Sequence, residues 1–449
     1  MAFFSEADMS VSFSHYYDDY DNLFRRLNPP RVVIDNEACD NATVMMVDYA
    51  NKHGILLEVV QILNDLNLII TKAYISSDGG WFMDVFNVTD QDGNKVTDEA
   101  VLNYIQKNLG PDSCCISPRR SVGVKQSMDY TTIEVLGADR PGLLSEVSAV
   151  LTHHKCNIVD AEVWTHNARA AAVMRVTDEE TGSAITDPHR LSLIKELLSN
   201  LLASCDNKKG RAKTVVTDEV THTDRRLHQM MCSDRDYERD PFDDDSDRRS
   251  RPNVNVVPCS EKDYSIVSIQ CKDRPKLVFD AVCALTDMEY VVFHGSIDAQ
   301  GPEAYQEYYI RHADGSPIKS DAERQRLVQC IEAAIERRVS EGVKLELCTG
   351  DRFGLLSDLT RILRENSLDV TRAQVSTKEG KAINTFYVRG ASRCPIDSNS
   401  IESVRQIIGS SILKVKGTTP IPANSQNSRF LFGGIFKSRS FADLVKSYC

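Results

Sequence analysis

Apolar residues recur at fixed offsets in four segments of this chain, each directly after a short turn. Counted from the last residue of the turn, offsets one, five, eight and nine are apolar in every segment. The residues at these offsets are Ile55, Val59, Ile62 and Leu63; Leu143, Val147, Val150 and Leu151; Leu277, Ala281, Ala284 and Leu285; and Leu355, Leu359, Ile362 and Leu363. Spacings of three and four place such residues on one face of an α-helix. The pattern therefore predicts four copies of one small unit, each with an amphipathic helix.

Strands are predicted on both sides of each helix. After the helix, offsets sixteen, nineteen and twenty-one are apolar or small in all four copies, which favours a strand packed under the helix. A hairpin signal and a second strand follow, at residues 81–88, 171–176, 305–311 and 383–388. A further strand precedes each turn, at residues 43–47, 131–136, 265–270 and 343–347. A second helix closes each unit, most clearly after the capping box Ser320-Asp321-Ala322-Glu323. The order β-α-β-β-α-β is the ferredoxin-like plan, an α+β fold with an antiparallel sheet.

The turns before the four helices share a sequence pattern. They read Asn51-Lys52-His53-Gly54, Asp139-Arg140-Pro141-Gly142, Asp273-Arg274-Pro275-Lys276 and Asp351-Arg352-Phe353-Gly354. N–H groups at a helix start attract a carboxylate, and glycine lets a ligand approach the backbone closely. A side-chain oxygen three residues before the glycine can accept a hydrogen bond from an ammonium group. The turns therefore suit an amino acid, which carries a carboxylate and an ammonium close together.

The spacing of the turns divides the chain into two parts. The aligned last positions of the turns are 88, 134 and 78 residues apart in order along the chain. The excess in the middle interval predicts a linker, and its charged runs at residues 234–240 and 243–245 predict disorder. The four units are therefore expected to form two tandem pairs, one on each side of the linker.

These patterns set the expected boundaries. They are residues 1–38 for an N-terminal extension, 39–126 and 127–217 for the first two units, 218–260 for the charged linker, 261–341 and 342–418 for the last two units, and 419–449 for a C-terminal tail. The extension is expected to be poorly ordered before Arg31. The tail contains Phe430-Leu431-Phe432-Gly433-Gly434-Ile435-Phe436-Lys437. Two interpretations of this tail stay open: docking on a partner or membrane surface, and packing on the last unit.

Composition narrows the function classes. The formal net charge of −12 argues against a nucleic-acid surface, and 41% hydrophobic residues suffice for several small cores. Thirteen cysteines without a CxxC pair fit a compartment that keeps thiols reduced. No apolar stretch reaches the roughly 20 residues of a membrane span. The N-terminus lacks the basic and apolar regions of a signal peptide, so secretion is not expected. The cytosol is the first expectation, and the nucleus stays open because of the basic cluster at residues 248–251.

Four ferredoxin-like units with Asp139-Arg140-Pro141-Gly142-Leu143-Leu144 as the fullest form of the turn resemble ACT domains. Four of them in a chain of this length are similar to the plant ACT-domain-repeat proteins, and the second unit also resembles the ACT units of bacterial uridylyltransferases. The resemblance covers about residues 41–417. It implies a non-catalytic regulatory protein that binds amino acids or similar small metabolites at interfaces between domains, as a sensor in amino-acid or nitrogen metabolism. The chain departs from the pattern at Phe353, at Lys276 and in the first unit, which shares only the glycine.

The ACT pattern also implies a second polar contact at the start of the next strand, which is offset fifteen. This position holds Ile69, Asn157, Val291 and Asp369 in turn. The second and fourth units keep all three features: the turn aspartate, the glycine and a polar residue at offset fifteen. Binding is therefore predicted in these two units. The predicted ligand-binding residues are Asp139, Gly142, Asn157, Asp351, Gly354 and Asp369, with Asn51, Gly54 and Asp273 at equivalent places in the other units. No metal site and no cofactor is expected.

Two alternatives compete with this interpretation. Each aspartate can instead be an ordinary helix cap, with proline and glycine serving the turn alone. The chain can also be an interaction scaffold whose units pair edge to edge and bind no metabolite, and the alanine-rich residues 168–172 suit such close packing. The deciding feature is whether Asp139, Gly142 and Asn157 line a crevice between units or are covered by a neighbouring unit.

Catalysis finds little support in the sequence. The chain has no GxxxxGK[ST], HExxH or GxSxG motif, so it is not expected to be an enzyme. The repeats occupy nearly every long segment, which leaves no room for a nucleotidyltransferase domain. The expected partners are an amino acid or similar small molecule and either a second copy of the chain or a regulated protein, without nucleic acid.

Overall fold

The structure, a computed structural model, describes residues 31–416 except residues 51–53, 79–80, 110–124, 127–128, 204–212, 218, 221, 239–250, 260–262, 300, 340–341 and 392–395. The chain divides into two compact units. Among the described residues, unit 1 takes residues 31–109 and 251–332, and unit 2 takes residues 125–238 and 333–416. The four repeats are called modules 1 to 4 below. The predictions for Asn51, for residues before Arg31 and for the tail after residue 418 lie outside the described residues.

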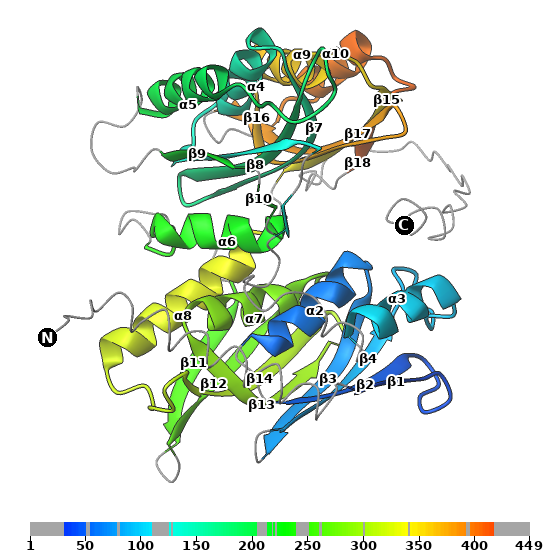
Figure 1. Cartoon of the computed structure of the whole chain (residues 1–449), viewed down its shortest axis with the longest axis vertical. Helices are drawn as coiled ribbons and strands as arrows, with labels where there is room; N and C mark the ends of the chain where they lie inside the picture. The colour runs from blue at the N-terminus through cyan, green and yellow to red at the C-terminus, as the bar shows by residue number, and fades with distance from the viewer. Residues whose placement is uncertain are drawn as a thin grey trace, which may run out of the picture. The chain divides into compact units, whose positions relative to one another are not determined.

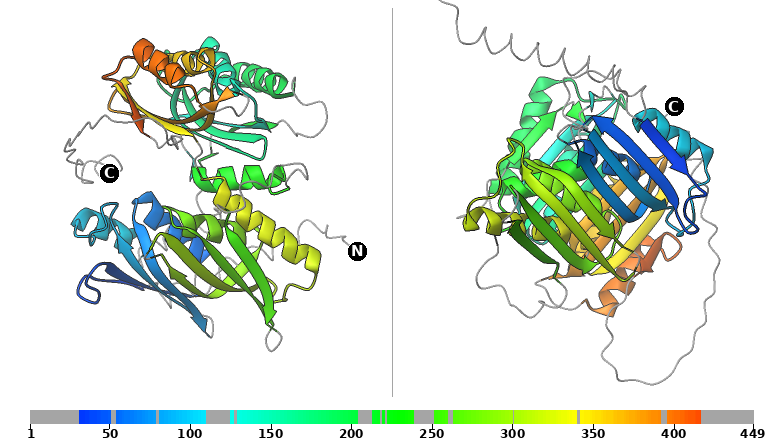
Figure 2. Two further views of the ribbon diagram at one scale, coloured as in Figure 1. Left: turned by 180° about the vertical axis from the view of Figure 1, so that it is seen from behind. Right: turned by 90° about the horizontal axis from the view of Figure 1, so that it is seen from below.

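Unit 1 is an antiparallel sheet with helices on one face (Figures 1 and 2). Module 1 contributes β1 (Arg31–Asp35), β2 (Thr43–Ala50), α2 (Ile55–Asp65), β3 (Ile69–Asp78), β4 (Trp81–Thr89) and α3 (Glu99–Leu109). Module 3 contributes β11 (Asn253–Cys259), β12 (Tyr264–Lys272), α7 (Leu277–Asp287), β13 (Tyr290–Asp298), β14 (Glu303–His312) and α8 (Asp321–Glu336). The strand order is β1-β2-β4-β3-β13-β14-β12-β11, so the two modules join where β3 pairs with β13.

Unit 2 repeats this plan. Module 2 contributes β6 (Thr131–Ala138), α4 (Leu143–His153), β7 (Cys156–His166), β8 (Arg169–Asp178), α5 (Pro188–Ala203) and β9 (Lys213–Thr217). Module 4 contributes β15 (Val343–Gly350), α9 (Leu355–Glu365), β16 (Leu368–Lys378), β17 (Lys381–Gly390), α10 (Ser398–Ile408) and β18 (Leu413–Lys416). The strand order is β18-β15-β17-β16-β7-β8-β6-β9, and the modules join where β7 pairs with β16. A short ribbon of β5 (Lys125–Gln126) and β10 (Glu219–Val220) and the helix α6 (Thr223–Ser233) complete the elements of this unit.

The predicted fold class is confirmed, whereas the pairing of the modules differs from the expected tandem arrangement. Module 1 pairs with module 3, with Ile75 opposite Gly295, and module 2 pairs with module 4, with Val163 opposite Ala373. The pairing joins the two edge strands that would otherwise present unpaired N–H and C=O groups. Each module therefore pairs with a module on the other side of the predicted linker, and not with its neighbour in the sequence.

The outer edge strands of modules 1 and 3 also differ from prediction. In module 2 the edge strand β9 follows the second helix and pairs with β6. In modules 1 and 3 the equivalent places beside β2 and β12 are taken by β1 and β11, which precede the module. Both strands run antiparallel to their neighbours, as β9 does, so either end of a module can supply this edge. As a result β1 lies in the predicted N-terminal extension, and β11 in the predicted linker.

The four helices after the turns form where the apolar periodicity predicts them. Each begins after a residue with positive φ: Gly54 at 86°, Gly142 at 80°, Lys276 at 65° and Gly354 at 73°. Their apolar faces are buried against the sheets. In unit 2 the buried residues of both modules form one continuous core that runs from Ile133 to Leu413. The two modules of this unit therefore share a core as well as a sheet.

Part of the predicted linker is helical rather than disordered. Leu227, Met230 and Met231 of α6 pack with Trp164 and its neighbours on the face of the unit 2 sheet opposite α4. Beyond α6, Asp236 accepts hydrogen bonds from Arg337, with Nε to Oδ2 at 2.7 Å, and both side chains are fully buried. The charged residues 234–238 are described, whereas the rest of the two predicted charged runs, residues 239–240 and 243–245, lies outside the described residues.

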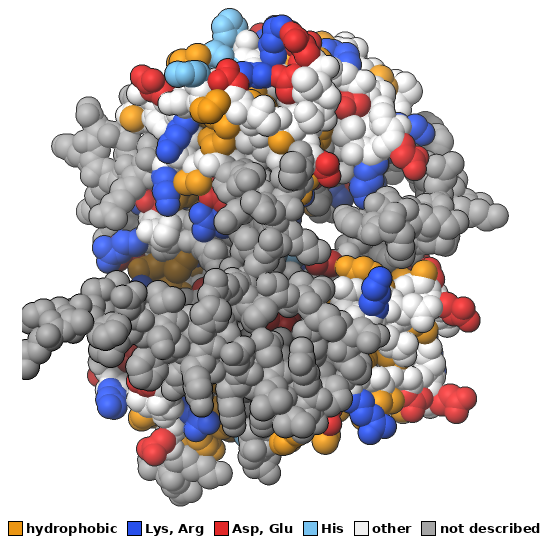
Figure 3. All heavy atoms as spheres, viewed as in Figure 1, with side chains coloured by type: hydrophobic (Ala, Val, Ile, Leu, Met, Phe, Trp, Pro, Cys, Tyr) orange, Lys and Arg blue, Asp and Glu red, His pale blue; other side chains and the backbone are white. Residues whose placement is uncertain are grey.

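Basic and acidic side chains are interspersed on the visible helical face of unit 2 (Figure 3). This distribution agrees with a mixed, solvated surface rather than a field of one sign. No helix among the described residues is long and apolar enough to cross a membrane.

Candidate functional site

A pocket of unit 2 lies between modules 2 and 4. Its walls come from the turn of module 2, the first turn of α4 and the alanines of β8 on one side. Arg364 at the end of α9 and Leu368 to Val370 at the start of β16 form the other side. The pocket, called pocket 1, holds about 550 Å³ of empty space, including its opening to solvent. The alanine-rich stretch that suited close packing thus leaves room beside the turn.

A second pocket is lined by the same elements with the roles of modules 2 and 4 reversed. The turn of module 4, the first turn of α9 and strands β16 and β17 line one side. Thr152 at the end of α4 and Cys156 to Ile158 at the start of β7 line the other. This pocket, called pocket 2, holds about 340 Å³ of empty space, including its opening to solvent. The two pockets are related by the approximate two-fold symmetry of the paired modules.

The structure brings the predicted residues together across modules rather than within one repeat. Asp139 and Gly142 line pocket 1 with Asp369 of module 4. Asp351 and Gly354 line pocket 2 with Asn157 of module 2. The grouping by repeat assumed that each turn meets its own following strand. In the structure, the turn of module 2 faces the start of β16 in module 4, and the turn of module 4 faces the start of β7 in module 2. Residue offsets within one repeat cannot indicate a contact with another repeat.

Each glycine of these turns lies against the partner module. A Cβ at Gly142 would lie 2.7 Å from Arg364 Cδ, and one at Gly354 would lie 3.3 Å from Thr152 Cγ2. Arg364 and Thr152 occupy equivalent positions at the ends of α9 and α4. The glycines are therefore needed both for positive φ and for the close approach of the paired helix.

The aspartate of each turn is anchored to the hairpin of its own module. The backbone N–H groups of Asp139, Asp273 and Asp351 donate to the carbonyls of Ala168, Pro302 and Gly380 at 2.9, 3.0 and 2.8 Å. The residues immediately before α4, α7 and α9 are Gly142, Lys276 and Gly354, and among the described residues no side chain caps these helices. The turn aspartates lie three residues before these cap positions, and hydrogen bonds from the backbone of Arg140 and Arg274 reach the carboxylates of Asp139 and Asp273. The first N–H groups of α4 and α9, those of Leu143 and Leu355, donate to the turn carbonyls of Arg140 and Arg352 at 3.2 and 3.1 Å. The next N–H groups of each first turn have no acceptor inside the helix, so they are available to a ligand.

An ionic cluster includes two aspartates of the pocket 1 wall, Asp139 and Asp369. Arg389 Nη2 lies 3.0 Å from an oxygen of Asp139 and 3.0 Å from an oxygen of Asp369. Burial and the neighbouring Asp369 carboxylate raise the pKa of Asp139 to about 6, against the opposing effect of Arg389. Pocket 2 has Asp351 and Asn157 at the corresponding places, and the position of Arg389 is taken by Thr177. The two pockets therefore differ in charge although their backbones are equivalent.

A recurrent ion pair that the sequence analysis missed holds the turn on its helix. Arg140 pairs with Glu146, with Nη1 to Oε1 at 2.9 Å. The equivalent pairs are Arg274 with Asp280 at 2.7 Å and Arg352 with Asp358 at 2.6 Å. The signal was present, because every repeat has an acidic residue four positions after the last turn residue. These pairs orient the turn backbone, and thereby the helix N-terminus, toward the pocket.

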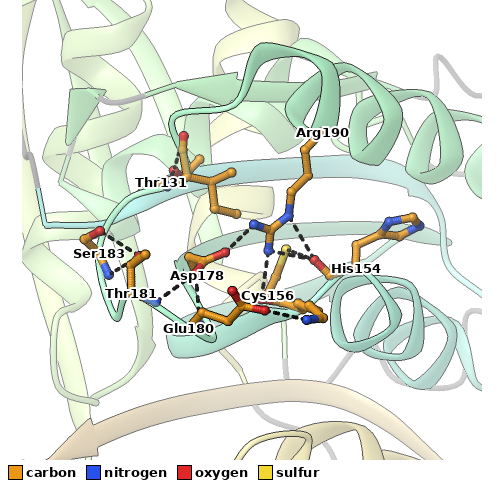
Figure 4. Close-up of polar contacts among 10 residues, drawn as sticks. Thr131, His154, Cys156, Asp178, Glu180, Thr181, Ser183 and Arg190 are labelled. Carbon is orange, nitrogen blue, oxygen red and sulfur yellow. Dashed lines mark hydrogen bonds and ion pairs between the residues drawn. The ribbon is translucent and has the colours of Figure 1, made fainter.

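The start of β7, which supplies Asn157 to pocket 2, is fixed by Arg190 of α5 (Figure 4). Arg190 Nη2 donates to the carbonyls of His154 at 2.8 Å and Lys155 at 2.9 Å, and Arg190 Nη1 pairs with Asp178. Burial raises the pKa of the Cys156 thiol beside this cluster. The connection between α4 and β7 is thus held rigidly where it borders the pocket.

The turns of unit 1 lack part of this arrangement. Gly54 faces Thr286 of module 3, whose Cγ2 would be 4.0 Å from an added Cβ, so modules 1 and 3 face each other in the same way. Asn51 lies outside the described residues, and the strand starts that correspond to Asp369 and Asn157 are Val291 and Ile69. Burial raises the pKa of Asp273. The structure therefore places the complete set of predicted polar residues in unit 2 alone.

Within the described residues no group of three or more His, Cys, Asp or Glu side chains is arranged to hold a metal ion. The candidate site is thus built from backbone N–H groups, carboxylates and apolar walls.

Comparisons with known proteins agree with the fold. A family model described as the ACR family N-terminal ACT domain matches residues 38–116, and one described as the ACT domain matches residues 131–203. The chain is 64% identical to the ACT domain-containing protein ACR4 of Arabidopsis thaliana, over 98% of this chain and 100% of that protein. It is 63% identical to the ACT domain-containing protein ACR5 of Arabidopsis thaliana, again over 98% and 100%.

A more distant relative covers part of the chain. The bifunctional uridylyltransferase/uridylyl-removing enzyme of Gluconobacter oxydans is 25% identical over 46% of this chain and 19% of that enzyme. The Arabidopsis relatives, by contrast, match over nearly their full length, which confirms the resemblance to plant ACT-domain-repeat proteins. The chain therefore belongs to the ACR family of ACT domain-containing proteins.

Proposed function

We propose that this protein is a non-catalytic regulator that binds free amino acids in pockets 1 and 2, between modules 2 and 4. The observation that carries the proposal is the convergence, in each pocket, of a helix N-terminus and a polar side chain of the paired module beside the turn aspartate. A ligand with a carboxylate and an ammonium group matches this combination, because each of its charges meets the opposite charge.

In pocket 1 the ligand carboxylate would accept hydrogen bonds from N–H groups in the first turn of α4. The ammonium would lie beside Asp139 and Asp369, where two carboxylates share the single guanidinium of Arg389. In pocket 2 the carboxylate would lie at the start of α9 and the ammonium beside Asp351. Binding at the junction would stabilise the paired modules together, which is how a ligand signal could reach a partner protein.

The first test is a thermal-shift screen of the full chain against the twenty amino acids, followed by calorimetry on each hit. A ligand that binds only the folded state raises the unfolding midpoint when its concentration exceeds its dissociation constant. We expect a selective shift that weakens in Asp139→Ala or Asp351→Ala. Asp321→Ala is the matched control, because this side chain is 93% exposed on the surface of module 3. A screen in which none of the twenty raises the midpoint would overturn the proposal.

A second candidate function is a scaffold without a metabolite. The specific observation in its favour is that modules 2 and 4 share a continuous sheet and a continuous core. On this view Arg389 satisfies Asp139 permanently, and the pocket is a packing gap. The screen separates the two functions, because a scaffold would show no amino-acid shift and yet keep its folded stability.

We further propose that the protein acts in the cytosol, in amino-acid or nitrogen metabolism, through a second copy of the chain or a regulated protein. The boundaries expected for the four modules stay proposals, with β1 and β11 added to modules 1 and 3. Transfer of a nucleotide or any other group by the pure protein would contradict the non-catalytic assignment.

A further inference from the structure

One position on the second strand after each helix is equivalent in all four modules. It is thirty residues after the last turn residue and holds Asp84, Ala172, Gln306 and Asn384. Strand register gives the same equivalence, because each residue lies between two apolar neighbours. Asn384 pairs with Leu347 and Val375, as Ala172 pairs with Val135 and Val163. Each of the four side chains is buried on the helix-covered face of its sheet.

Two of these four side chains bury a polar atom without a hydrogen-bond partner among the described residues, and the atoms are Nε2 of Gln306 and Oδ1 of Asn384. The carboxylate of Asp84 is buried as well, with a backbone hydrogen bond from Ser76. A buried polar atom without a partner costs about 1 to 3 kcal/mol, and such atoms are rare in folded proteins. Packing defects would be scattered, whereas these buried polar atoms recur at one equivalent position. The recurrence indicates a place where a bound molecule supplies the missing hydrogen-bond partner.

In unit 2 this position borders the two pockets. Ala172 lines pocket 1, and Asn384 lines pocket 2. Asn384 is 2% exposed, and it lines a pocket that already contains a helix N-terminus and Asn157. Its buried Oδ1 has no hydrogen-bond partner among the described residues. Its counterpart Ala172 lies among apolar side chains, including Val163 and Met174, in the wall of pocket 1. Besides the difference between Asp369 and Asn157, the two pockets therefore also differ in polarity at this strand position.

We propose that this position selects the side group of the ligand, so that pocket 2 takes a ligand with an uncharged hydrogen-bond donor and pocket 1 takes a ligand with an apolar side group. The inference rests on the proposed function, since it assumes that amino acids enter the pockets. Asn384 Oδ1 accepts a hydrogen bond from a hydroxyl or amide group of the ligand. A cationic side group does not fit as well, because a neutral amide cannot offset the cost of burying its charge. At Ala172 the methyl group offers no acceptor, so this strand position gives a polar side group no hydrogen-bond partner in pocket 1.

The test is calorimetry on the full chain with four probes: L-glutamine and L-threonine for the polar class, and L-leucine and L-valine for the apolar class. In Asn384→Ala we expect about tenfold weaker binding of the polar probe that binds best, as for loss of one hydrogen bond. Binding of the apolar probes should not change. The control is Thr385→Ala, the next residue on β17, whose side chain points to the other face of the sheet. The reciprocal variant Ala172→Asn should weaken leucine or valine binding and strengthen glutamine or threonine binding.

A second readout needs no ligand. Because Asn384 Oδ1 has no partner in the folded protein, Asn384→Ala should unfold at the same temperature as the parent protein or higher. A clear loss of stability in the ligand-free variant would show instead that Asn384 supports the fold.

The outcomes distinguish this inference from the proposed function. If no amino acid binds the parent protein, both fail. If both probe classes bind and neither variant changes the profile, the selection inference fails alone, and amino-acid binding stands. Binding of the apolar probes only, unaffected by Asn384→Ala, also overturns the assignment of pocket 2.

Discussion

Asp139 of module 2 and Asp369 of module 4 share one guanidinium nitrogen, with Arg389 Nη2 3.0 Å from an oxygen of each carboxylate. The two aspartate side chains are 10% and 5% exposed, so water screens them little. One cation between two carboxylates leaves a net negative charge when both are ionised. An ammonium group that enters pocket 1 would neutralise this charge, which links ligand binding to the ionisation of Asp139.

We expect ligand affinity at pocket 1 to rise between about pH 5 and pH 7. The pKa of Asp139 is raised to about 6, mainly by burial and the Asp369 carboxylate. Below this pH the carboxyl is protonated and attracts the ammonium less, so the ligand must displace a proton. Calorimetry with the best apolar amino acid at several pH values measures the effect, and Asp139→Asn should remove it. An affinity that stays flat across this range in the parent protein would exclude Asp139 as the ammonium partner.

Replacement of Arg389 by methionine should destabilise unit 2 by about 2 to 3 kcal/mol, because it leaves two buried carboxylates without their cation. Urea unfolding followed by circular dichroism gives the free energy. Arg352→Met is the control, since Arg352 is 58% exposed in its pair with Asp358 and a surface pair contributes at most about 1 kcal/mol. Equal losses in the two variants would show that the cluster is no more important than a surface ion pair.

Gly142→Ala should cost about 1 to 2 kcal/mol of stability and also reduce binding at pocket 1. The φ of 80° disfavours any residue with a Cβ, and the new methyl group would press on Arg364. Gly350→Ala is a matched control, because it has no atom within 4 Å of the added Cβ and no positive φ. Urea unfolding and calorimetry report the two effects separately. A fully stable Gly142→Ala protein with unchanged binding would contradict the close approach of α9.

The pH dependence of stability should contain a contribution from Asp84. Burial raises the pKa of Asp84 from 3.8 to about 8. The folded state therefore keeps a proton that the unfolded chain releases, so stability falls as the pH rises from about 4 to about 8. Asp84→Asn cannot titrate, and its unfolding free energy should fall less over this range. The comparison uses urea unfolding of both proteins at each pH, and parallel curves would exclude the raised pKa.

Arg337→Met should destabilise unit 2 by about 3 to 5 kcal/mol, since Asp236 would remain buried without its main cation. Asp236 is completely buried, and Arg337 and His166 hold its pKa well below the usual range against the effect of burial. The exposed pair of Lys155 with Glu180 supplies the control variant Lys155→Met, for which a small change is expected. Hydrogen exchange of α6 would show whether the loss is local, because this helix lies next to Asp236 in the chain.

The fold of each module follows closely from local sequence patterns. The spacing of four and three in Ile55, Val59 and Ile62 defines a helix without reference to the rest of the chain, and the same is true of the equivalent residues in the other modules. The pairing of modules depends instead on which edge strands meet, and alternation along β3 or β7 is equally compatible with any partner. For this reason the sequence could not indicate that β7 meets β16.

In the candidate site, too, the features that are local in sequence were predictable and those that depend on module pairing were not. Asp139, Gly142 and the helix N-terminus are close in sequence, so the turn could be recognised from one repeat. Asp369 reaches pocket 1 from a different module, and the unpartnered Asn384 becomes visible only when burial is known. The β1 and β11 edges were missed because a strand outside the repeat can replace the last strand of the repeat without a change in the sheet.

The pairing of module 1 with 3 and of module 2 with 4 has a consequence for synthesis of the chain. When the ribosome has completed the first two modules, each holds only half of a sheet, and strands β3 and β7 still present open edges. Neither sheet can close until residues beyond 290 and 368 have emerged. Folding of this protein is therefore dominated by contacts distant in sequence, which are slow to form and leave edge strands open to wrong partners in the meantime. A nascent or truncated chain that ends in the linker carries two unfinished sheets, and it should need a chaperone or the separately supplied second half of the chain to stay soluble.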